Sequence, residues 1–324
     1  MTEITNPHDR LFKDVWSRRE AAQDFFRNYL PGDILDAIDL NTLRICKDSF
    51  VQDDLREFFS DLLYKVSISG HEGYIYLLFE HKSYSERLIL IQLLSYMRSI
   101  WDLHLKQHSF PLPVVIPLVL YHGRQKWDQP KSLLHLFSPS AEPFTRYIPD
   151  FQIIVYDLSQ YPDEAIKGTI LSRVVLLLFK HVFHADFARK LPGILSLFRS
   201  LVEKETGMQY IETVLRYILS TIEDMGTEEL KEMVEQTLSS GKGELIMTLA
   251  ERIRNEGIQQ GMLEGLIEGI ELGLGLKFGA SGLKLMPAIR QIRDPERLKA
   301  VKEAIKLAKS RSELEEVING YISK

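Results

Sequence analysis

The stretch Tyr74–Glu80, YIYLLFE, constrains the fold more than any other part of the sequence. It is apolar at odd and even positions alike, which is typical of a strand covered on both faces. The stretch Ser60–Ile68, SDLLYKVSI, reads as a second strand, and the SGHEG segment between the two supplies the glycines of a hairpin turn. The sequence therefore predicts two paired strands inside an α/β domain, with helices on both sides of the sheet.

Further elements surround this hairpin. We expect an amphipathic helix over residues 8–30, a weak strand over 40–46, a long helix over 85–108, and buried strands over 114–123 and 151–158. The order of helix, three strands, helix and further strands predicts an α/β fold. Beyond Pro162 the hydrophobic pattern becomes helical. We therefore expect three parts: a core over residues 1–160, a helical extension over 161–236 and a helical tail over 237–324.

Composition and charge limit the partners. Of the 324 residues, 45% are hydrophobic and 26% are charged, as in ordinary globular proteins. The net charge of −5 argues against a chain coated with positive charge, although residues 277–324 hold 11 basic and 6 acidic side chains. The single cysteine, Cys46, excludes an internal disulfide and fits a cytoplasmic protein. The segment FPLPVVIPLVLY is short and holds three prolines, so we expect no membrane span.

Charged residues at one end of the predicted hairpin indicate a site. Glu80 and Lys82 are two residues apart and leave the same face of a strand. Asp61 begins the neighbouring strand, so the hairpin brings both carboxylates to the same end. Carboxylates are the ligands that Mg²⁺ prefers, and the main-chain carbonyl of His81 is a further candidate ligand. This set predicts metal-dependent phosphoryl chemistry with Lys82 beside the attacking water, whereas an isolated E-x-K is most often a surface ion pair.

Gln92 and Tyr96 are four residues apart on the helix that follows, so they share a face. An amide and a phenol near the carboxylates can hold a phosphate or the waters of a metal. The alternative is that Tyr96 belongs to the core and Gln92 lies at its edge.

These residues carry a resemblance. Asp61, FEHKS and QLLSYM together resemble the PD-(D/E)-x-K, or restriction-endonuclease-like, superfamily, including the Q-x-x-x-Y helix of its RecB-type members. The chain is more closely similar to the Rpn family of bacterial recombination-promoting nucleases, also described as transposases, over roughly residues 6–160. The segments that carry this likeness are HDRLFK, DLREFFSDLLYKV, YIYLLFEHKS, YMRSIWDLHLKQH and VIPLVLYHGRQKW.

The resemblance implies a fold, a restriction-endonuclease-like αβββαβ core with a mixed central sheet flanked by helices, followed by an all-helical C-terminal region. It also implies a metal-dependent DNA endonuclease linked to recombination or transposition, and it leaves a role in phage defence open. The expected cofactor is Mg²⁺, which Mn²⁺ or Ca²⁺ can replace or modulate.

Residue roles follow by position from the resemblance. Asp61 and Glu80 become metal ligands, Lys82 the catalytic lysine, and Gln92 and Tyr96 accessory groups. Asp9 matches the place where the superfamily often supplies an extra acid, although an i,i+4 pair with Lys13 accounts for it equally well. Ser60 stands where the pattern has proline.

Two alternatives remain. A non-catalytic DNA-binding or protein-interaction module would keep the same fold, and RNA could replace DNA as the substrate. His8 and Asp9 also spell the HD of a class of phosphohydrolases, but the sequence lacks the further histidines of that site.

Glycines recur at positions 257, 261, 265, 269 and 273. Each lowers helix stability by about 0.8–1 kcal/mol relative to alanine, and on a helix they form one slowly winding stripe. A partner helix packed on the stripe would offset this loss, which predicts a homo-oligomer formed through the C-terminal helices. A partly helical connector is the equal alternative. The resemblance also implies a possible partner, a separately translated C-terminal fragment that begins at a methionine such as Met225, Met233 or Met247, pairs with the full chain and inhibits it.

Overall fold

The computed structural model describes residues 6–46, 60–80, 88–108, 110–200, 205–221, 227–238 and 243–322. The chain divides into two compact units, Met1–Ile246 and Met247–Lys324, and each is described by itself. The division into three parts at residues 160 and 236 stays a prediction.

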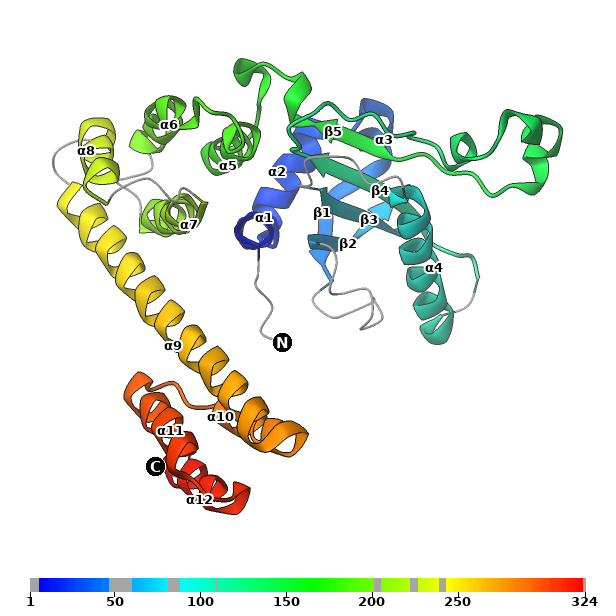
Figure 1. The fold of residues 1–324 in the computed structure, drawn as a ribbon. Helices are drawn as coiled ribbons and strands as arrows, with labels where there is room; N and C mark the ends of the chain where they lie inside the picture. Colours follow the sequence, from blue (N-terminus) through cyan, green and yellow to red (C-terminus); the bar gives the residue numbers. More distant parts are fainter. Residues whose placement is uncertain are drawn as a thin grey trace. The chain divides into compact units, whose positions relative to one another are not determined.

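The first unit is built around a five-stranded sheet with the order β1-β2-β3-β4-β5 (Figure 1). The first three strands pair antiparallel, and β3, β4 and β5 pair parallel, so the sheet is mixed. The predicted α/β class and the order of helix, three strands, helix and strands are confirmed. The strands are β1 (Ile38–Ile45), β2 (Ser60–Ile68), β3 (His71–Glu80), β4 (Val114–Tyr121) and β5 (Ile154–Asp157).

The predicted hairpin joins β2 to β3. Ile68 pairs with His71, which leaves Ser69 and Gly70 as a two-residue turn. Both turn residues have positive φ, 49° and 82°, as a type I′ turn requires, and the twist of such a turn matches that of the paired strands. Glycine at the second position adopts this conformation without a steric penalty.

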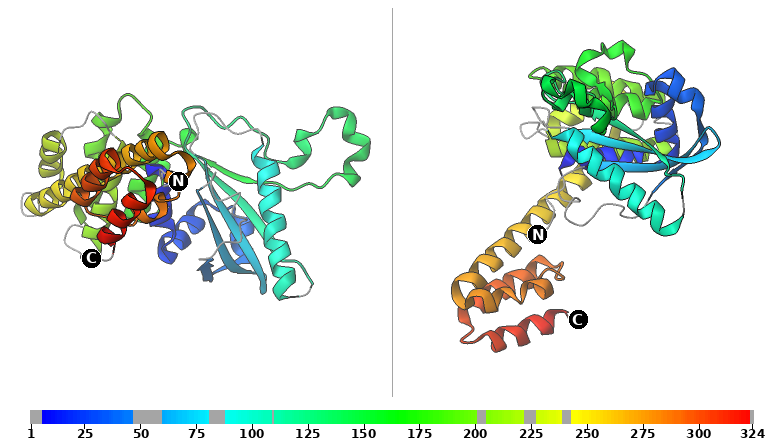
Figure 2. Two further views of the ribbon diagram at one scale, coloured as in Figure 1. Left: turned by 60° about the horizontal axis from the view of Figure 1, so that its bottom comes forward. Right: turned by 90° about the vertical axis from the view of Figure 1, so that its right-hand side faces the viewer.

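Helices cover both faces of β3, as its apolar sequence predicts (Figure 2). Tyr74, Tyr76 and Leu78 belong to the hydrophobic cluster of α4 (Ile89–Gln107), which begins four residues later than the sequence suggested. On the other face, the ring of Phe79 stacks on that of Phe12, with centroids 4.6 Å apart. A strand enclosed in this way leaves polar groups room only at its two ends.

The single helix expected over residues 8–30 is wrong, because the chain breaks at Arg18. Arg18 is extended, with φ −84° and ψ 123°. If residues 8–30 formed one continuous helix, the buried positions before and after Arg18 would lie on two stripes about 80° apart around it. The break at Arg18 turns the second helix so that both stripes face the core. The resulting helices are α1 (Pro7–Trp16), α2 (Arg19–Tyr29) and α3 (Gly32–Ala37).

The connection between β4 and β5 projects from the sheet (Figures 1 and 2). It holds the 3₁₀ segments η2 (Leu133–Leu136) and η3 (Pro139–Tyr147). Helices follow β5, and α5 lies against the sheet beside α1, since Phe179 contacts Phe79 with centroids 4.7 Å apart. These helices are α5 (Ile170–His181), α6 (Phe187–Ser196), α7 (Glu205–Thr221) and α8 (Thr227–Leu238).

The second unit is helical and has its own core. Its elements are α9 (Gly243–Leu283), whose first residues lie in the first unit, α10 (Met286–Ile289), α11 (Pro295–Leu307) and α12 (Arg311–Ile322). Helix α9 kinks at Gly279, where φ is 58°. Ile270 and Leu274 of α9 are buried with Leu298, Val301 and Ile305 of α11.

The glycine stripe on α9 has two different surroundings. A Cβ at Gly273 would lie 3.5 Å from Cγ2 of Ile305, and one at Gly269 would lie 3.8 Å from Nζ of Lys302. At Gly257, Gly261 and Gly265 a Cβ would meet nothing within 4 Å. The later glycines therefore face α11 of the same chain, and the earlier three face open space. Across both units, the described helices include none with the length and apolarity to cross a bilayer.

Candidate active site at the carboxyl end of β3

The register of the hairpin defines this end of the sheet. Asp61 pairs with Leu78, two residues before Glu80, which is the last residue of β3. Residues opposite each other in a pair share a face, as do residues two apart. The backbone therefore places positions 61 and 80 diagonally on one side of the sheet, at one end. Lys82 and His81 lie outside the described residues, as do the side chains of Asp61 and Glu80, so their roles stay predictions.

Helix α4 carries the two accessory residues at different depths. The ring of Tyr96 is 2% exposed and stacks on Tyr76, with centroids 5.1 Å apart. Tyr76 lies four residues before Glu80, or about 13 Å along the strand, so Tyr96 is a core residue of this face. Gln92 lies one turn closer to the start of α4. Its Oε1 is buried and has no hydrogen-bond partner among the described residues, which suits contact with a water or a ligand.

Asp9 approaches the same end from the other face. It lies in the first turn of α1, and its Oδ1 atom is buried. Phe12, one turn further along α1, stacks on Phe79, the neighbour of Glu80. This contact fixes the N-terminal turn of α1 near the end of β3.

Two histidines lie at this turn of α1: His8, which the sequence offered only as part of an HD pair, and His122, which no sequence pattern indicated. His122 follows β4, is 2% exposed, and stacks on Phe79 with centroids 4.6 Å apart. His8 lies 5.3 Å from His122 between ring centroids, and its Nδ1 is hydrogen-bonded to Oη of Tyr217 at 2.8 Å. Burial raises the pKa of Tyr217 well above its usual value, so the phenol stays protonated. These contacts tie α1, β4 and α7 together.

The phosphohydrolase alternative at His8 and Asp9 gains no support. In the described part of the chain, no three His, Cys, Asp or Glu ligand atoms converge around these two residues. The histidines instead pack against aromatic rings.

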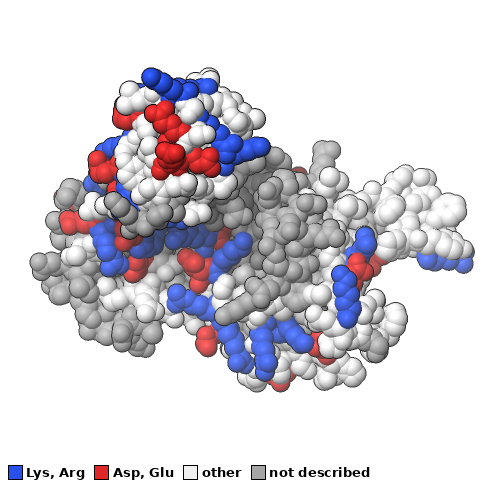
Figure 3. Space-filling model, turned by 90° about the horizontal axis from the view of Figure 1, so that it is seen from below, with Lys and Arg blue, Asp and Glu red and all other residues white. Residues whose placement is uncertain are grey.

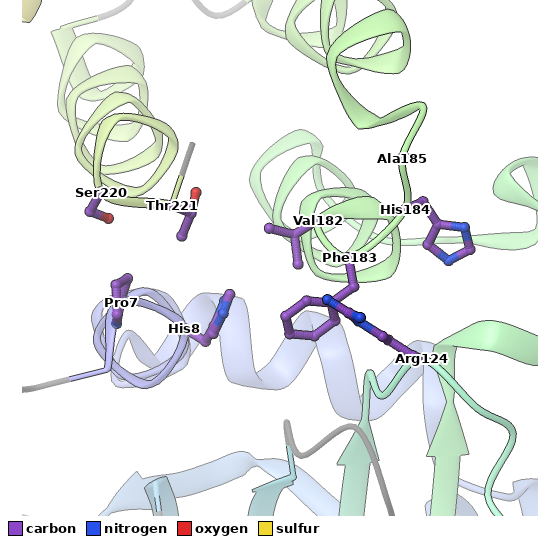
Figure 4. Close-up of a pocket in the computed structure, with 9 residues that line it drawn as sticks. All are labelled: Pro7, His8, Arg124, Val182, Phe183, His184, Ala185, Ser220 and Thr221. Carbon is purple, nitrogen blue, oxygen red and sulfur yellow. The ribbon is translucent and has the colours of Figure 1, made fainter. Parts of the chain in front are cut away.

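A pocket of about 500 Å³ opens beside this layer (Figure 4). Arg124, two residues after His122, extends into it, and its guanidinium lies 5.6 Å from the centroid of the Phe183 ring. No acidic side chain is among the described residues that line the pocket, so its charge suits a phosphate group. The lining residues are Pro7, His8, Arg124, Val182, Phe183, His184, Ala185, Ser220 and Thr221.

The described residues form no broad basic patch on the face seen in Figure 3. There, basic and acidic side chains of the described residues are interspersed, in keeping with the net charge of −5. Phosphate recognition is therefore expected to depend on particular side chains such as Arg124.

Comparison with known proteins gives the family. The family model described as "Putative transposase, YhgA-like" matches residues 6–209. The chain is 31% identical to recombination-promoting nuclease RpnA of Escherichia coli K12, over 79% of this chain and 86% of that protein. It is 32% identical to recombination-promoting nuclease RpnD of Escherichia coli O157:H7, over 79% of this chain and 98% of that protein.

The chain belongs to the Rpn family. This confirms the resemblance seen in the sequence, and the names of the relatives support a nuclease-like role for the family. An Rpn relative from Escherichia coli K12, 31% identical over 81% of this chain and 86% of its own length, is named "Inactive recombination-promoting nuclease-like protein RpnE". Family membership alone therefore does not establish activity. No solved structure matches this Rpn chain.

Proposed function

We propose that the chain is a divalent-metal-dependent DNA endonuclease that hydrolyses phosphodiester bonds during recombination or transposition, with a role in phage defence left open. One observation carries the proposal: the pairing of Asp61 with Leu78 puts two acidic positions, 61 and 80, at one end of the β2–β3 hairpin, whose strand β3 is covered on both faces. Two acidic positions at one strand end repel each other unless a cation or another partner offsets their charge, and the named nucleases among the relatives support the same reading.

The donor set fits Mg²⁺, which takes one or two carboxylates and keeps several waters, and Mn²⁺ or Ca²⁺ would fit the same oxygen ligands. When bound there, the ion supplies positive charge at a phosphoryl oxygen. Asp61 and Glu80 hold it, with the main-chain carbonyl of His81 as a further ligand. Asp9 adds an acid from α1.

The other residues act on water and on DNA. Lys82 orients the attacking water and offsets the charge that develops on the phosphate. Gln92, whose buried Oε1 has no hydrogen-bond partner among the described residues, orients a water at the start of α4. Tyr96 supports this turn of the helix from the core. Arg124 holds a neighbouring DNA phosphate in the pocket beside the strand end.

For the second unit we propose a role in assembly. The open glycines of α9 bind the same helix of a second copy, and a C-terminal fragment beginning at Met225, Met233 or Met247 pairs with the full chain and inhibits it. One cysteine in 324 residues suits the reducing cytoplasm, where we place the protein.

The second candidate function is a non-catalytic DNA-binding or protein-interaction module. The relative named inactive favours it, because that protein is as similar to this chain as the named nucleases are. An RNA-directed nuclease would use the same residues on a different substrate.

One experiment separates these functions. Purified full-length protein is stripped of metal with a chelator and incubated with supercoiled plasmid, linear DNA or RNA, with and without added Mg²⁺. We expect Mg²⁺-dependent cleavage of DNA that Glu80→Ala and Asp61→Ala abolish. Glu142→Ala, which removes an exposed acid in the projection between β4 and β5, is the matched control and should cleave normally. DNA binding without cleavage under any metal would favour the non-catalytic module.

A further inference from the structure

The opposite end of the sheet holds a second group of potential ligands. Glu72, at the start of β3, lies eight residues before Glu80, or about 26 Å along the strand. A groove of about 1250 Å³ opens there between the β2–β3 turn, the last turn of α4 and the start of β4. His104 of α4, His108 directly after α4 and Glu72 of β3 line it.

The three side chains converge. One ligand atom from each of Glu72, His104 and His108 lies within 4.8 Å of the other two. Nδ1 of His104 is 3.7 Å from Oε1 of Glu72. Two ligands of one tetrahedral ion, each about 2.0–2.1 Å from it, lie about 3.4 Å apart. The measured pair is therefore close to the separation that a shared metal ion requires.

His104 indicates that this convergence binds a ligand. Its side chain is only 9% exposed, and its buried Nδ1 has no hydrogen-bond partner in the part of the chain that the structure describes. At 3.7 Å the contact with Glu72 is too long for a hydrogen bond. Buried polar atoms are normally satisfied, and a cation between this nitrogen and the carboxylate would satisfy both groups.

Neighbouring groups fix the carboxylate in position. Oη of Tyr74 donates a hydrogen bond of 2.9 Å to Oε1 of Glu72, and the ammonium of Lys65 pairs with Oε2. Such contacts orient a metal ligand and restrict its motion. A plain charge network around Glu72 explains the contacts of Lys65 and Tyr74 and the 3.7 Å ion pair with His104, but it gives the buried nitrogen of His104 no hydrogen bond from the described residues.

Helix α4 sets the spacing of the two histidines. His104 lies in the last turn of α4, and His108, four residues later in the sequence HLKQH, is the residue that caps the helix, with its N–H donating to the carbonyl of His104 at 2.7 Å. Their ring centroids are 5.0 Å apart. The same spacing of two histidines on a helix is a common arrangement for binding one ion.

We propose that Glu72, His104 and His108 bind a divalent transition-metal ion, with Zn²⁺ the best match. Two imidazoles and one carboxylate form a borderline donor set that suits Zn²⁺, whereas Mg²⁺ prefers oxygen ligands alone. Three protein ligands leave a fourth position that faces the groove. The bound ion joins the β2–β3 turn to the end of α4 and stabilises both. The proposal is independent of the nuclease function at the other end of the sheet.

The test uses the full-length protein, freed of metal with a chelator and titrated calorimetrically with Zn²⁺ in excess Mg²⁺. We expect one Zn²⁺ per chain. His108→Ala and Glu72→Gln should each weaken Zn²⁺ binding at least roughly tenfold. Losing a residue that only holds a metal ligand in place already weakens metal binding about tenfold to hundredfold, and these variants remove a ligand itself. His108 is exposed, so H108A should fold normally and melt like wild type without metal. Zn²⁺ should raise the Tm of wild type and leave that of H108A unchanged.

Three control variants make the result specific. His135→Ala removes an exposed histidine of η2, Cys46→Ser removes the only thiol, and Glu80→Ala removes the carboxylate at the other strand end. All three should bind Zn²⁺ as wild type does. Equal stoichiometry and affinity in wild type and H108A would overturn the proposal. So would Zn²⁺ binding that disappears in C46S or E80A.

Discussion

The two units of this Rpn protein differ in where they leave room for other molecules. In the first, β3 is buried on both faces, and polar groups gather only at its ends. In the second, α9 leaves Ile258 and Met262 60% and 41% exposed beside glycines at which an added Cβ would meet no described atom within 4 Å. The ends of an enclosed strand suit catalysis or metal binding, because the surrounding packing holds the few polar groups there in fixed positions. An apolar helix face with glycines suits association, because it lets a second helix approach closely.

The family comparison follows the same division. The matched residues, 6–209, hold the whole sheet and end within α7, so the second unit lies outside the family model. We therefore expect variants in the first unit to change cleavage or DNA binding and variants on α9 to change assembly alone.

The largest expected effect is on catalysis. Glu80→Ala or Asp61→Ala should abolish measurable DNA cleavage, because the metal that stabilises the developing charge is lost with its ligand. Circular dichroism should stay near wild type. The measurement is the initial rate of plasmid nicking in Mg²⁺. A change on α9 that lowered this rate as much as E80A would contradict the separation of the units.

A variant of Lys82 distinguishes the cleavage step from DNA binding within the first unit. Lys82→Ala should lower single-turnover cleavage by about 10²–10⁴-fold, as loss of a general acid–base or charge-stabilising group does. DNA affinity, measured in Ca²⁺, should change only a few-fold. A large loss of affinity at an unchanged cleavage rate would assign Lys82 to DNA binding instead.

The sequence predicted those parts of the fold that depend on neighbouring residues. The apolar run of β3 and the glycine of its turn are local, and both elements formed as expected. The break at Arg18 was missed, although the stripes on its two sides are out of phase. The apolar residues before Arg18 and those after it each have helical spacing, so the angle between the two stripes is apparent only when both segments are placed on one helix.

Sites that join distant elements were harder to predict. Glu80 and Lys82 stand out because they are two residues apart in the sequence, whereas Glu72 meets His104 only because α4 returns along β3. The spacing of HLKQH was the available signal, but it names no third ligand. The contact of His8 with Tyr217 spans 209 residues, and no local pattern predicts it.

A smaller effect is expected at the phosphate pocket. Arg124→Ala should weaken DNA binding about tenfold and reduce the slope of log affinity against log salt by about one, because one phosphate contact is lost. The matched control is Arg98→Ala, since Arg98 is exposed on α4 and pairs with Asp102. Fluorescence anisotropy at several salt concentrations measures both. Equal affinities for R124A and R98A would place DNA elsewhere.

The smallest energetic effect, and the one that tests the second unit most directly, is at Gly261. Gly261→Leu adds bulk where the stripe is open and should lower the oligomer mass in light scattering, with cleavage per active site unchanged. Gln259→Leu places the same leucine side chain about 200° away around α9 and should leave the mass as it is.

Gly261→Ala distinguishes the two interpretations of the stripe. In a helix that binds no partner, alanine should stabilise the second unit by about 0.8–1 kcal/mol and change nothing else. In a close helix–helix contact, the added methyl group should instead reduce the mass or the Tm of the assembly. An unchanged mass in both G261A and G261L, with the full stabilisation in G261A, would contradict the assembly role. The glycines would then serve as a connector, and chemistry in the first unit would have to proceed without a partner bound along this stripe.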